Sequence, residues 1–211
     1  MRLSTRGLGV FCATAAIALS AGAARDDDFK PLVKGDDPAQ FELVGINAKT
    51  LTIKDGEVQV SGKPNGYFAT KESYKNYVLK FEWMYERPAK LVSDDKFNGN
   101  GGLLLNIQGE PRVWPKSIEF QLMNKEVGKI YPIGGAKLEG KWDAAAYKKA
   151  IKPVGEWNEE VATCENGVMT CVLNGVEVTR GKNPSPANGQ IGWQSEGAPM
   201  RFRKLMIKST D

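Results

Sequence analysis

The chain has 211 residues, of which 41% are hydrophobic and 26% are charged, a composition typical of one folded domain with a substantial core. Its formal net charge of +4 is small and its basic residues form no stripe, which argues against a nucleic-acid partner. The sequence contains no histidine, which excludes Ser-His-Asp and Cys-His triads, excludes the usual zinc sites and leaves proton transfer to Asp, Glu, Tyr or Lys.

The first 24 residues have the pattern of a secretory signal peptide. Arg2 and Arg6 precede an apolar run over 8–19, and the small residues at 21–23 suit a cleavage site. The apolar run is shorter than the roughly 20 residues that a membrane span needs. We therefore expect residues 1–24 to be removed, with export to the periplasm or beyond and no stable membrane anchor.

The next segment, 25–40, is rich in Asp, Lys and Pro and is predicted to be a loose lead-in to a single domain over 41–211. Short runs of alternating apolar and polar residues predict strands within this domain. In chain order, the first of these are 41–44, 51–54, 57–60, 67–70, 77–85 and 103–107. Asp55-Gly56 is a residue pair preferred in two-residue hairpin turns.

The clearest strand is the stretch 117–124, with the sequence SIEFQLMN. Its apolar residues alternate with Glu119 and Gln121, so one face is predicted to be buried while a carboxylate and an amide project together from the other. Such a pair on rigid backbone suits binding a hydroxyl-rich ligand or moving a proton. The alternative interpretation is an ordinary polar strand face in contact with water.

Further strands are predicted at 129–131, on both sides of the cysteines, at 176–178, at 191–194 and at 200–207. The one helical candidate is 142–151, which has three consecutive alanines and ends before Pro153. About a dozen short strands and almost no helix predict an all-β fold. Two antiparallel sheets in a jelly-roll sandwich fit best, with one short helix and a concave sheet that exposes a polar face.

Cys164 and Cys171 flank a turn between two alternating runs. If Asn166-Gly167 is the two-residue loop, the two sulfurs are diagonal, and if Gly167-Val168 is the loop, they are opposite each other. An oxidising compartment permits a disulfide, but a bridge between adjacent strands is geometrically demanding. The sequence leaves a bridge and two buried thiols as equal alternatives.

Six short motifs follow one another along the domain: NGGLLL at 100–105, IEFQ at 118–121, GEWN at 155–158, LNGV at 173–176, GQIGWQ at 189–194 and FRKL at 202–205. In this order they resemble the 3-keto-disaccharide hydrolase domain family over roughly 41–208. The resemblance implies a concanavalin A-like lectin/glucanase sandwich, export, and action on oxidised sugars. It places Glu119 and Gln121 at the family's Glu-x-Gln position, on the concave face where such sandwiches hold carbohydrate.

The chain departs from the family's pattern at three places. Gly101 and Asn106 stand where the family has a serine and an arginine, and Lys204 replaces an asparagine. Because Asn106 replaces the family's arginine, a positive charge near the expected site is lost. This affects the expected substrate class and leaves the expected fold unchanged.

An ordinary glycosidase needs two carboxylates, about 5–5.5 Å apart when it retains configuration and about 6.5–9.5 Å apart when it inverts. The stretch 117–124 offers only one carboxylate, Glu119, because Gln121 is neither a nucleophile nor an acid. Unless a loop acid supplies the second carboxylate, conventional glycoside hydrolysis is disfavoured. The candidates for such a loop acid are Glu110, Glu196, Asp94 and Asp95.

A ketone at C3 of the sugar reduces this requirement, since it acidifies the C2 proton. One base can then start elimination of the anomeric substituent, and water adds to the unsaturated sugar afterwards. We hypothesise that Glu119 is this base and that Gln121 orients it or the substrate. No cofactor is predicted; a lysine, an arginine or a bound divalent metal ion would stabilise the enolate.

The other substrate-binding candidates are side chains that can stack on or hydrogen-bond a sugar: Asn106, Trp114, Trp157, Asn158, Gln194 and Arg203. Trp157 has a core position as its alternative, the amides of Asn158 and Gln194 can cap backbone instead, and Arg203 can form a surface ion pair. The expected partner is an oligosaccharide or 3-keto-sugar. A carbohydrate-binding module without catalysis and a purely structural sandwich are the competing interpretations.

Overall fold

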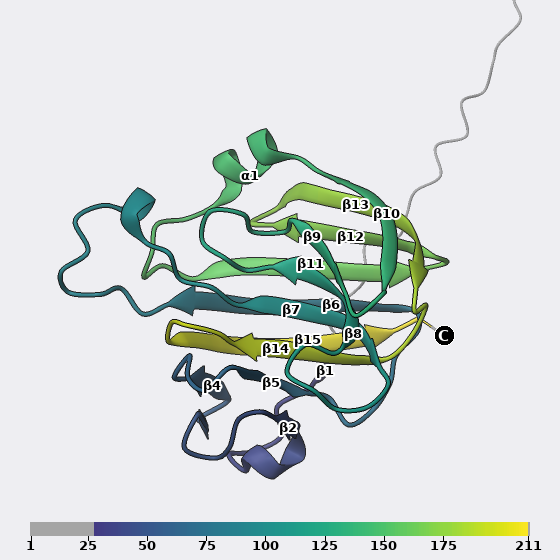
Figure 1. Cartoon of the computed structure of the whole chain (residues 1–211), viewed down its shortest axis with the longest axis horizontal. Coiled ribbons are helices and arrows are strands. Elements are labelled where there is room, and N and C mark those ends of the chain that lie inside the picture. Colours follow the sequence, from purple (N-terminus) through teal and green to yellow (C-terminus); the bar gives the residue numbers. More distant parts are fainter. Residues whose placement is uncertain (1–27, 211) are drawn as a thin grey trace, which may run out of the picture.

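The computed structural model describes residues 28–210, so the predicted signal peptide lies outside the described residues. Over this range the chain forms two antiparallel sheets packed face to face, one nine-stranded and one six-stranded (Figure 1). The jelly-roll sandwich predicted from the sequence is therefore confirmed.

The larger sheet has the order β10-β13-β12-β11-β6-β15-β4-β3, with β1 pairing to β15. Its strands are β1 (Lys30–Pro31), β3 (Leu51–Lys54), β4 (Glu57–Val60), β6 (Tyr77–Tyr85), β10 (Lys137–Trp142), β11 (Asn158–Glu165), β12 (Val168–Leu173), β13 (Val176–Ser185) and β15 (Met200–Ser209). The smaller sheet has the order β2-β5-β14-β7-β8-β9. Its strands are β2 (Glu42–Val44), β5 (Gly66–Ala69), β7 (Gly102–Gln108), β8 (Lys116–Gln121), β9 (Ile130–Ile133) and β14 (Gln190–Ser195).

The main core lies between the two sheets. Phe68 of β5 and Trp193 of β14 stack with ring centroids 5.2 Å apart, and both meet rings from the larger sheet. Phe202 lies 5.8 Å from Phe68, and Phe81 lies 5.9 Å from Trp193. These four buried rings bring β5 and β14 onto β6 and β15 and help to hold the two layers together.

A second, smaller hydrophobic cluster covers the outer face of the six-stranded sheet. It comprises Val44, Tyr67, Ala69, Leu104 and Ile107, with Ile133 packed against it. The loop 109–115 lies over this end of the sheet: Val113 approaches Gly45 after β2, and Arg112 approaches Gly134 after β9. Since β2 and β9 are the two edge strands, this loop reaches across the width of the sheet and helps to bury the cluster.

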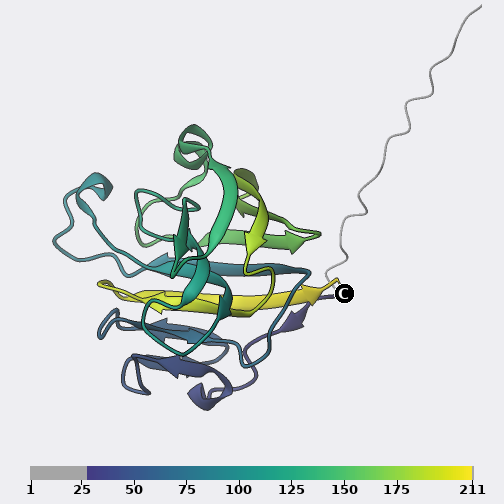
Figure 2. The same ribbon diagram turned by 45° about the vertical axis from the view of Figure 1, so that its right-hand side comes forward.

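Helices are short in the described chain. They are η2 (Pro38–Gln40), η3 (Asp94–Lys96) and α1 (Ala144–Ala150). Asp143 caps α1, since its side chain accepts from the amides of Ala145 and Ala146, and this shortens the predicted 142–151 helix at its start. Figures 1 and 2 show α1 at the top, beyond the β10–β13 edge, and the 86–101 loop extending to the left.

Two segments differ from the sequence-based expectation. Residues 30–31 pair with β15 and the amide of Leu32 donates to the Leu205 carbonyl, so this part of the lead-in is attached to the sheet and is not loose. Residues 137–142 form β10, which alternation did not predict because Glu139, Gly140 and Lys141 follow one another without an apolar residue between them. All three are exposed in the structure.

The cysteine hairpin adopts the first of the two predicted registers. Glu165 pairs with Val168, so Asn166-Gly167 is the loop, with both residues at positive φ. Cys164 lies opposite Met169, and Cys171 lies opposite Ala162. The sulfurs are therefore diagonal, and both residues are buried without a disulfide.

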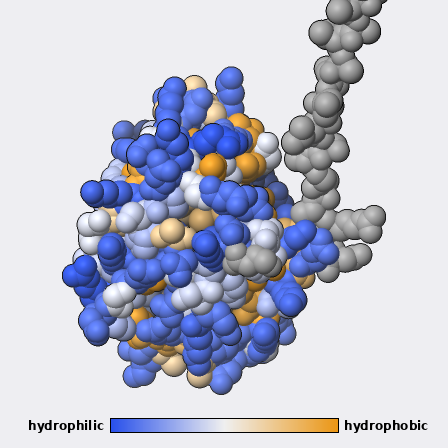
Figure 3. Space-filling model, turned by 90° about the vertical axis from the view of Figure 1, so that its right-hand side faces the viewer, coloured by the Kyte–Doolittle hydropathy of each residue, from blue (hydrophilic) through white to orange (hydrophobic). Residues whose placement is uncertain are grey.

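The surface is mainly hydrophilic on the face that Figure 3 shows, with hydrophobic residues in small scattered patches. Between residues 28 and 210 the structure has no helix that is both long and apolar enough to cross a lipid bilayer.

Candidate functional site

Glu119 projects from β8 onto the outer face of the six-stranded sheet. Its neighbours Ile118 and Phe120 point into the main core, and its register partner on β7 is Leu104 of the outer cluster. The orientation predicted for the strand at 117–124 is thus correct. The carboxyl is not surrounded by water, however, because Glu119 is only 6% exposed.

Gly102 lets two side chains meet over β7. A Cβ placed on Gly102 would lie 2.2 Å from Oε1 of Glu119 and 2.4 Å from Oε1 of Gln194. The ends of these two side chains, one from β8 and one from β14, therefore lie over the same glycine. A side chain at position 102 would occupy the space in which they meet.

The Gln194 amide is buried without a hydrogen-bond partner. Gln194 is 1% exposed, and neither its Oε1 nor its Nε2 has a partner among the described residues. Oδ1 of Asn100, close by in the chain to Gly102, is likewise buried and unpartnered. Because buried amide atoms are almost always hydrogen-bonded, these atoms mark a place where a polar ligand or water belongs.

Glu196 supplies a second carboxyl to this face. It directly follows β14, two residues after Gln194, and an isolated bridge pairs it with Asn100. Glu196 is half-buried; burial raises the pKa of its carboxyl, and a hydrogen bond from Asn100 offsets part of the rise. Among the four loop acids considered from the sequence, this is the one whose charge acts on Glu119.

The two carboxyls interact electrostatically. Burial first, and then the charge of Glu196, raise the pKa of Glu119 from 4.5 to about 8. Tyr85 responds to both acids: its burial, then Glu196, then Glu119, hold the pKa of its hydroxyl well above 10. At neutral pH, Glu119 is therefore mostly protonated, whereas an ordinary glutamate would be ionised.

Gln121 lies beside this pair, opposite Gly102, and is 8% exposed. Its Oε1 accepts from the amide of Met123 at 2.8 Å, which fixes the side chain on the strand end. Because the side-chain oxygen of Gln121 already accepts from the backbone, its NH₂ group is the part of the side chain that can bind a ligand.

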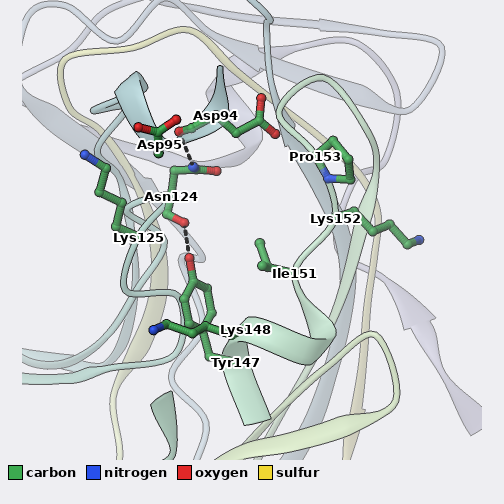
Figure 4. Close-up of a pocket in the computed structure, with 9 residues that line it drawn as sticks. All are labelled: Asp94, Asp95, Asn124, Lys125, Tyr147, Lys148, Ile151, Lys152 and Pro153. Carbon is green, nitrogen blue, oxygen red and sulfur yellow. Dashed lines mark hydrogen bonds between the residues drawn. The ribbon is translucent and has the colours of Figure 1, made fainter. Parts of the chain in front are cut away.

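The other loop acids are held elsewhere. Asp94 pairs with Arg87 at 2.6 Å and accepts from the amide of Val154, and Asp95 accepts from Ser93. Both acids line a cavity of about 430 Å³ beside α1, shown in Figure 4 with Asn124 and Tyr147. Glu110 is exposed in the loop 109–115.

Large cavities lie away from Glu119. Besides the one beside α1, a cavity of about 600 Å³ lies along β1 and the end of β15. Neither is lined by Glu119 or Gln194. Glu119, Gln121 and Gln194 are only 6%, 8% and 1% exposed, so the polar face around Glu119 is largely covered and is not the open concave surface expected from the sequence.

Two predicted substrate-binding residues are in structural positions. Asn158 is 3% exposed; its Oδ1 accepts from the Lys152 amide and from Nδ2 of Asn174. Asn106 sits at positive φ in a bulge of β7, and its Nδ2 donates to the Pro186 carbonyl. These amides satisfy backbone groups, the alternative considered for Asn158.

Trp157 and Arg203 belong to the other sheet. The Arg203 guanidinium stacks 4.0 Å from the Trp157 ring centroid and pairs with Glu82 of β6 at 2.5 Å. Residues 82 and 203 alternate with the buried residues of β6 and β15, so this group lies on the outer face of the nine-stranded sheet. Their assignment to the Glu119 site was wrong, since alternation does not reveal to which sheet a strand belongs.

Trp114 is the one predicted aromatic that remains at the rim of the Glu119 face. It is 42% exposed in the loop that crosses the outer cluster. Among the described residues, no group of three or more Cys, Asp or Glu side chains is arranged to hold a metal ion.

The structure resembles several solved structures at low sequence identity. Two proposed glycosyl hydrolases from Parabacteroides distasonis ATCC 8503 match with a TM-score of 0.64 each. They share 20% and 18% identity, over 86% and 90% of this chain and 98% and 99% of theirs. A protein of unknown function with a galectin-like fold from Bacillus subtilis matches with a TM-score of 0.62 and 11% identity, over 86% and 94%. At these identities the likeness concerns the fold.

A comparison with curated proteins found no match. A comparison with protein-family models gave a match over residues 28–208, nearly the whole described chain. The chain therefore belongs to the family of the 3-keto-alpha-glucoside-1,2-lyase-like domain, also called the 3-keto-disaccharide hydrolase domain.

Proposed function

We propose that this protein is a carbohydrate-active enzyme that cleaves the glycosidic bond of 3-keto-glycosides or 3-keto-disaccharides. The observation that supports the proposal most directly is the pair Glu119 and Gln194, a protonatable carboxyl and an unpartnered amide meeting over Gly102. Perturbed carboxyls next to unsatisfied polar groups are typical of sites that bind and transform polar ligands. The family description, a 1,2-lyase acting on a 3-keto-glucoside, supports the same reaction class.

The reaction begins with removal of the proton at C2, which the neighbouring C3 ketone acidifies. The resulting enolate expels the substituent at C1, leaving a double bond between C1 and C2. Addition of water across this double bond gives the free 3-keto-sugar, so the net result is hydrolysis. Both halves need a proton acceptor and a proton donor, and a carboxyl with a pKa near 8 exchanges protons readily at neutral pH.

The test is incubation of the purified protein with 3-keto-trehalose and with a 3-keto-glucoside, following release of the reducing sugar. We expect turnover by the wild type and a loss of at least about 100-fold in Glu119→Gln, which keeps the shape of the side chain but cannot transfer a proton. Glu110→Gln, an exposed loop carboxyl, is the matched control and should retain full activity.

A carbohydrate-binding module without catalysis is the alternative function. The observation that favours it is the unpartnered Gln194 amide, which can hydrogen-bond a sugar hydroxyl without any proton transfer. It predicts saturable sugar binding with no product, and binding that survives Glu119→Gln. If the wild type neither binds nor cleaves any 3-keto-sugar, the carbohydrate assignment itself is wrong.

Export completes the proposal, on the strength of the signal-like residues 1–24. Expression of the full chain in a bacterium should yield a periplasmic or secreted protein whose N-terminus, read by mass spectrometry, follows residue 24. A cell-associated product that retains Met1 would contradict it.

A further inference from the structure

Glu119 and Glu196 differ in their surroundings although they share one site. Glu119 projects from β8, which is paired on both sides, and is 6% exposed, whereas Glu196 follows a strand end and is half-buried. Burial penalises the charged form of a carboxyl, so the deeper acid retains its proton to higher pH. Two carboxyls within electrostatic reach also resist being ionised together.

The groups around Glu119 reinforce this difference in protonation, because no positively charged side chain among the described residues acts on the pKa of Glu119. On β9 its register partner is Tyr131, whose hydroxyl donates to Glu126. On the β14 side it meets Gln194, and its carboxyl oxygen and the amide oxygen share the space over Gly102. Tyr85, from the other sheet, donates its hydroxyl to the Leu122 carbonyl. Burial and the charge of Glu196 are the causes that act on the pKa of Glu119, and no cation is among them.

Resting on the function proposed above, we propose that the two acids have different roles: Glu196 is the base that takes the C2 proton, and Glu119 is the neutral acid that donates a hydrogen bond to the C3 oxygen. Gln194 is then a substrate-binding amide. This assignment revises the initial hypothesis, in which Glu119 was the base. It also identifies what stabilises the enolate, since Arg203 lies on the opposite face of the molecule.

The electrons and protons balance without a metal or a cofactor. Glu196 accepts the proton as the C2–H bond breaks, and the electron pair forms an enolate whose oxygen accepts from the Glu119 O–H group. The enolate then re-forms the ketone as a C1–C2 double bond forms and the C1–O bond breaks. The leaving oxygen takes the proton from Glu196, so both acids return to their starting forms. A neutral carboxylic acid that stabilises an enolate in this way is a known catalytic pattern.

The first experiment is the pH dependence of kcat/KM on a 3-keto-glucoside. We expect a bell-shaped profile in the wild type: the rate falls at low pH as Glu196 becomes protonated, and falls again above about pH 8 as Glu119 loses its proton. Glu196→Gln should lose about 100-fold or more because it cannot accept the C2 proton. Glu119→Gln should lose a similar factor because an amide N–H is a weaker hydrogen-bond donor to the enolate oxygen than a carboxylic acid O–H. The residual activity of the first should lack the acidic fall, and that of the second should lack the alkaline fall.

The second experiment needs no turnover. Carbon-13 NMR of glutamate side-chain carboxyls should show Glu119 titrating near pH 8 in the wild type. In Glu196→Gln the midpoint should drop but stay above 4.5, because burial is the larger cause of the shift. In Glu110→Gln it should not move.

A failure of the roles assigned to the two acids can be distinguished from a failure of the proposed function. A rate that keeps rising through pH 8, with Glu196→Gln retaining activity, would overturn the division of roles while leaving the proposed function intact. Turnover without any NMR response to Glu196→Gln would show that the two acids do not interact. An intact NMR response without turnover would retain the pair and overturn both the reaction and the roles assigned in it.

Discussion

Gly102 determines how Glu119 and Gln194 approach each other, because it is the residue of β7 that lies between them. The atoms that an added Cβ would meet are the ends of these two side chains and not the backbone. Such atoms can move, so substitution should change the site more than the stability of the fold.

We therefore expect Gly102→Ala to lower activity by about 10-fold or more, since misplacing catalytic groups by about 1 Å is known to have large effects. The melting temperature should change little. The matched control is Gly181→Ala on β13, where the added Cβ would meet the Leu138 side chain on the larger sheet. It should leave kcat/KM unchanged. Full activity in Gly102→Ala would show that the close approach over β7 is not needed.

At the scale of the strands, Glu160 links its strand to two neighbouring strands inside the main core. It lies on β11 and is fully buried; Nε1 of Trp83 on β6 donates to its Oε2 at 3.3 Å, and Cys171 on β12 hydrogen-bonds the same carboxyl. Burial is the largest effect and raises the pKa of Glu160 from 4.5 to about 8, although both hydrogen bonds oppose the rise. The strands are therefore joined through a carboxyl that is neutral at physiological pH.

The pH dependence of stability follows from this shift. An acid whose pKa is raised on folding binds its proton more tightly in the folded state, so the free energy of unfolding decreases as pH rises from the unfolded pKa of 4.5 to about 8. Glu160→Gln should remove this contribution and be more stable than the wild type at about pH 8 by at least about 1 kcal/mol. Urea denaturation between about pH 5 and pH 9 measures it.

The exposed neighbour Glu159 provides the control for this experiment, since Glu159→Gln changes the same charge on the same strand outside the core. It should follow the wild-type curve. An unchanged pH dependence in Glu160→Gln would mean that Glu160 is not the buried acid responsible.

Asn158 connects the segment after α1 to the β12–β13 turn. It accepts from the Lys152 amide and from Nδ2 of Asn174, which also donates to the Ala150 carbonyl. Asn158→Ala would leave these donors unpaired, and we expect it to reduce the free energy of unfolding by about 1–3 kcal/mol. KM for a 3-keto-glucoside should not change. A raised KM with unchanged stability would restore the substrate-binding role predicted from the sequence.

At the scale of the whole molecule, the two outer faces have different chemistry. The six-stranded sheet carries the carboxyl pair and an apolar cluster. The nine-stranded sheet carries ion pairs, with Arg201 on Glu57 and with Arg203 and Lys204 on Glu82, each at 2.5 Å. These pairs involve partly exposed side chains, so each contributes little to stability.

We expect a saccharide to contact only the first of these faces. Trp157→Ala, on the nine-stranded sheet, should leave sugar affinity unchanged, whereas Trp114→Ala, at the rim of the other sheet, should weaken it several-fold. Isothermal titration calorimetry with a 3-keto-disaccharide compares the two. Weakening by Trp157→Ala alone would place the ligand on the wrong side of the sandwich for the proposed reaction.

Alternation along single strands predicted much of this architecture. It placed Glu119 outside the core and Arg203 opposite Phe202, and the turn residues predicted the Asp55-Gly56 hairpin. For the cysteine hairpin the sequence left two registers open, of which the structure adopts the one with Asn166-Gly167 as the loop. Alternation did not show which strands share a sheet, which is why Arg203 and Trp157 were assigned to the wrong face. The sequence could not single out Glu196 among the four loop acids, because pairing between distant strands, and not any local pattern, brings it to Glu119.

The loop 109–115 has a practical consequence for altering this protein. The acids and amides of the site project from strands or from a strand end, whereas the exposed Trp114 belongs to a loop that merely rests on the sheet through contacts such as Val113 with Gly45. Grafting loops of other lengths and sequences between β7 and β8 should therefore redirect which sugars are accepted without dismantling the proton-transfer machinery. Selectivity and chemistry would then be separately engineerable in one small scaffold.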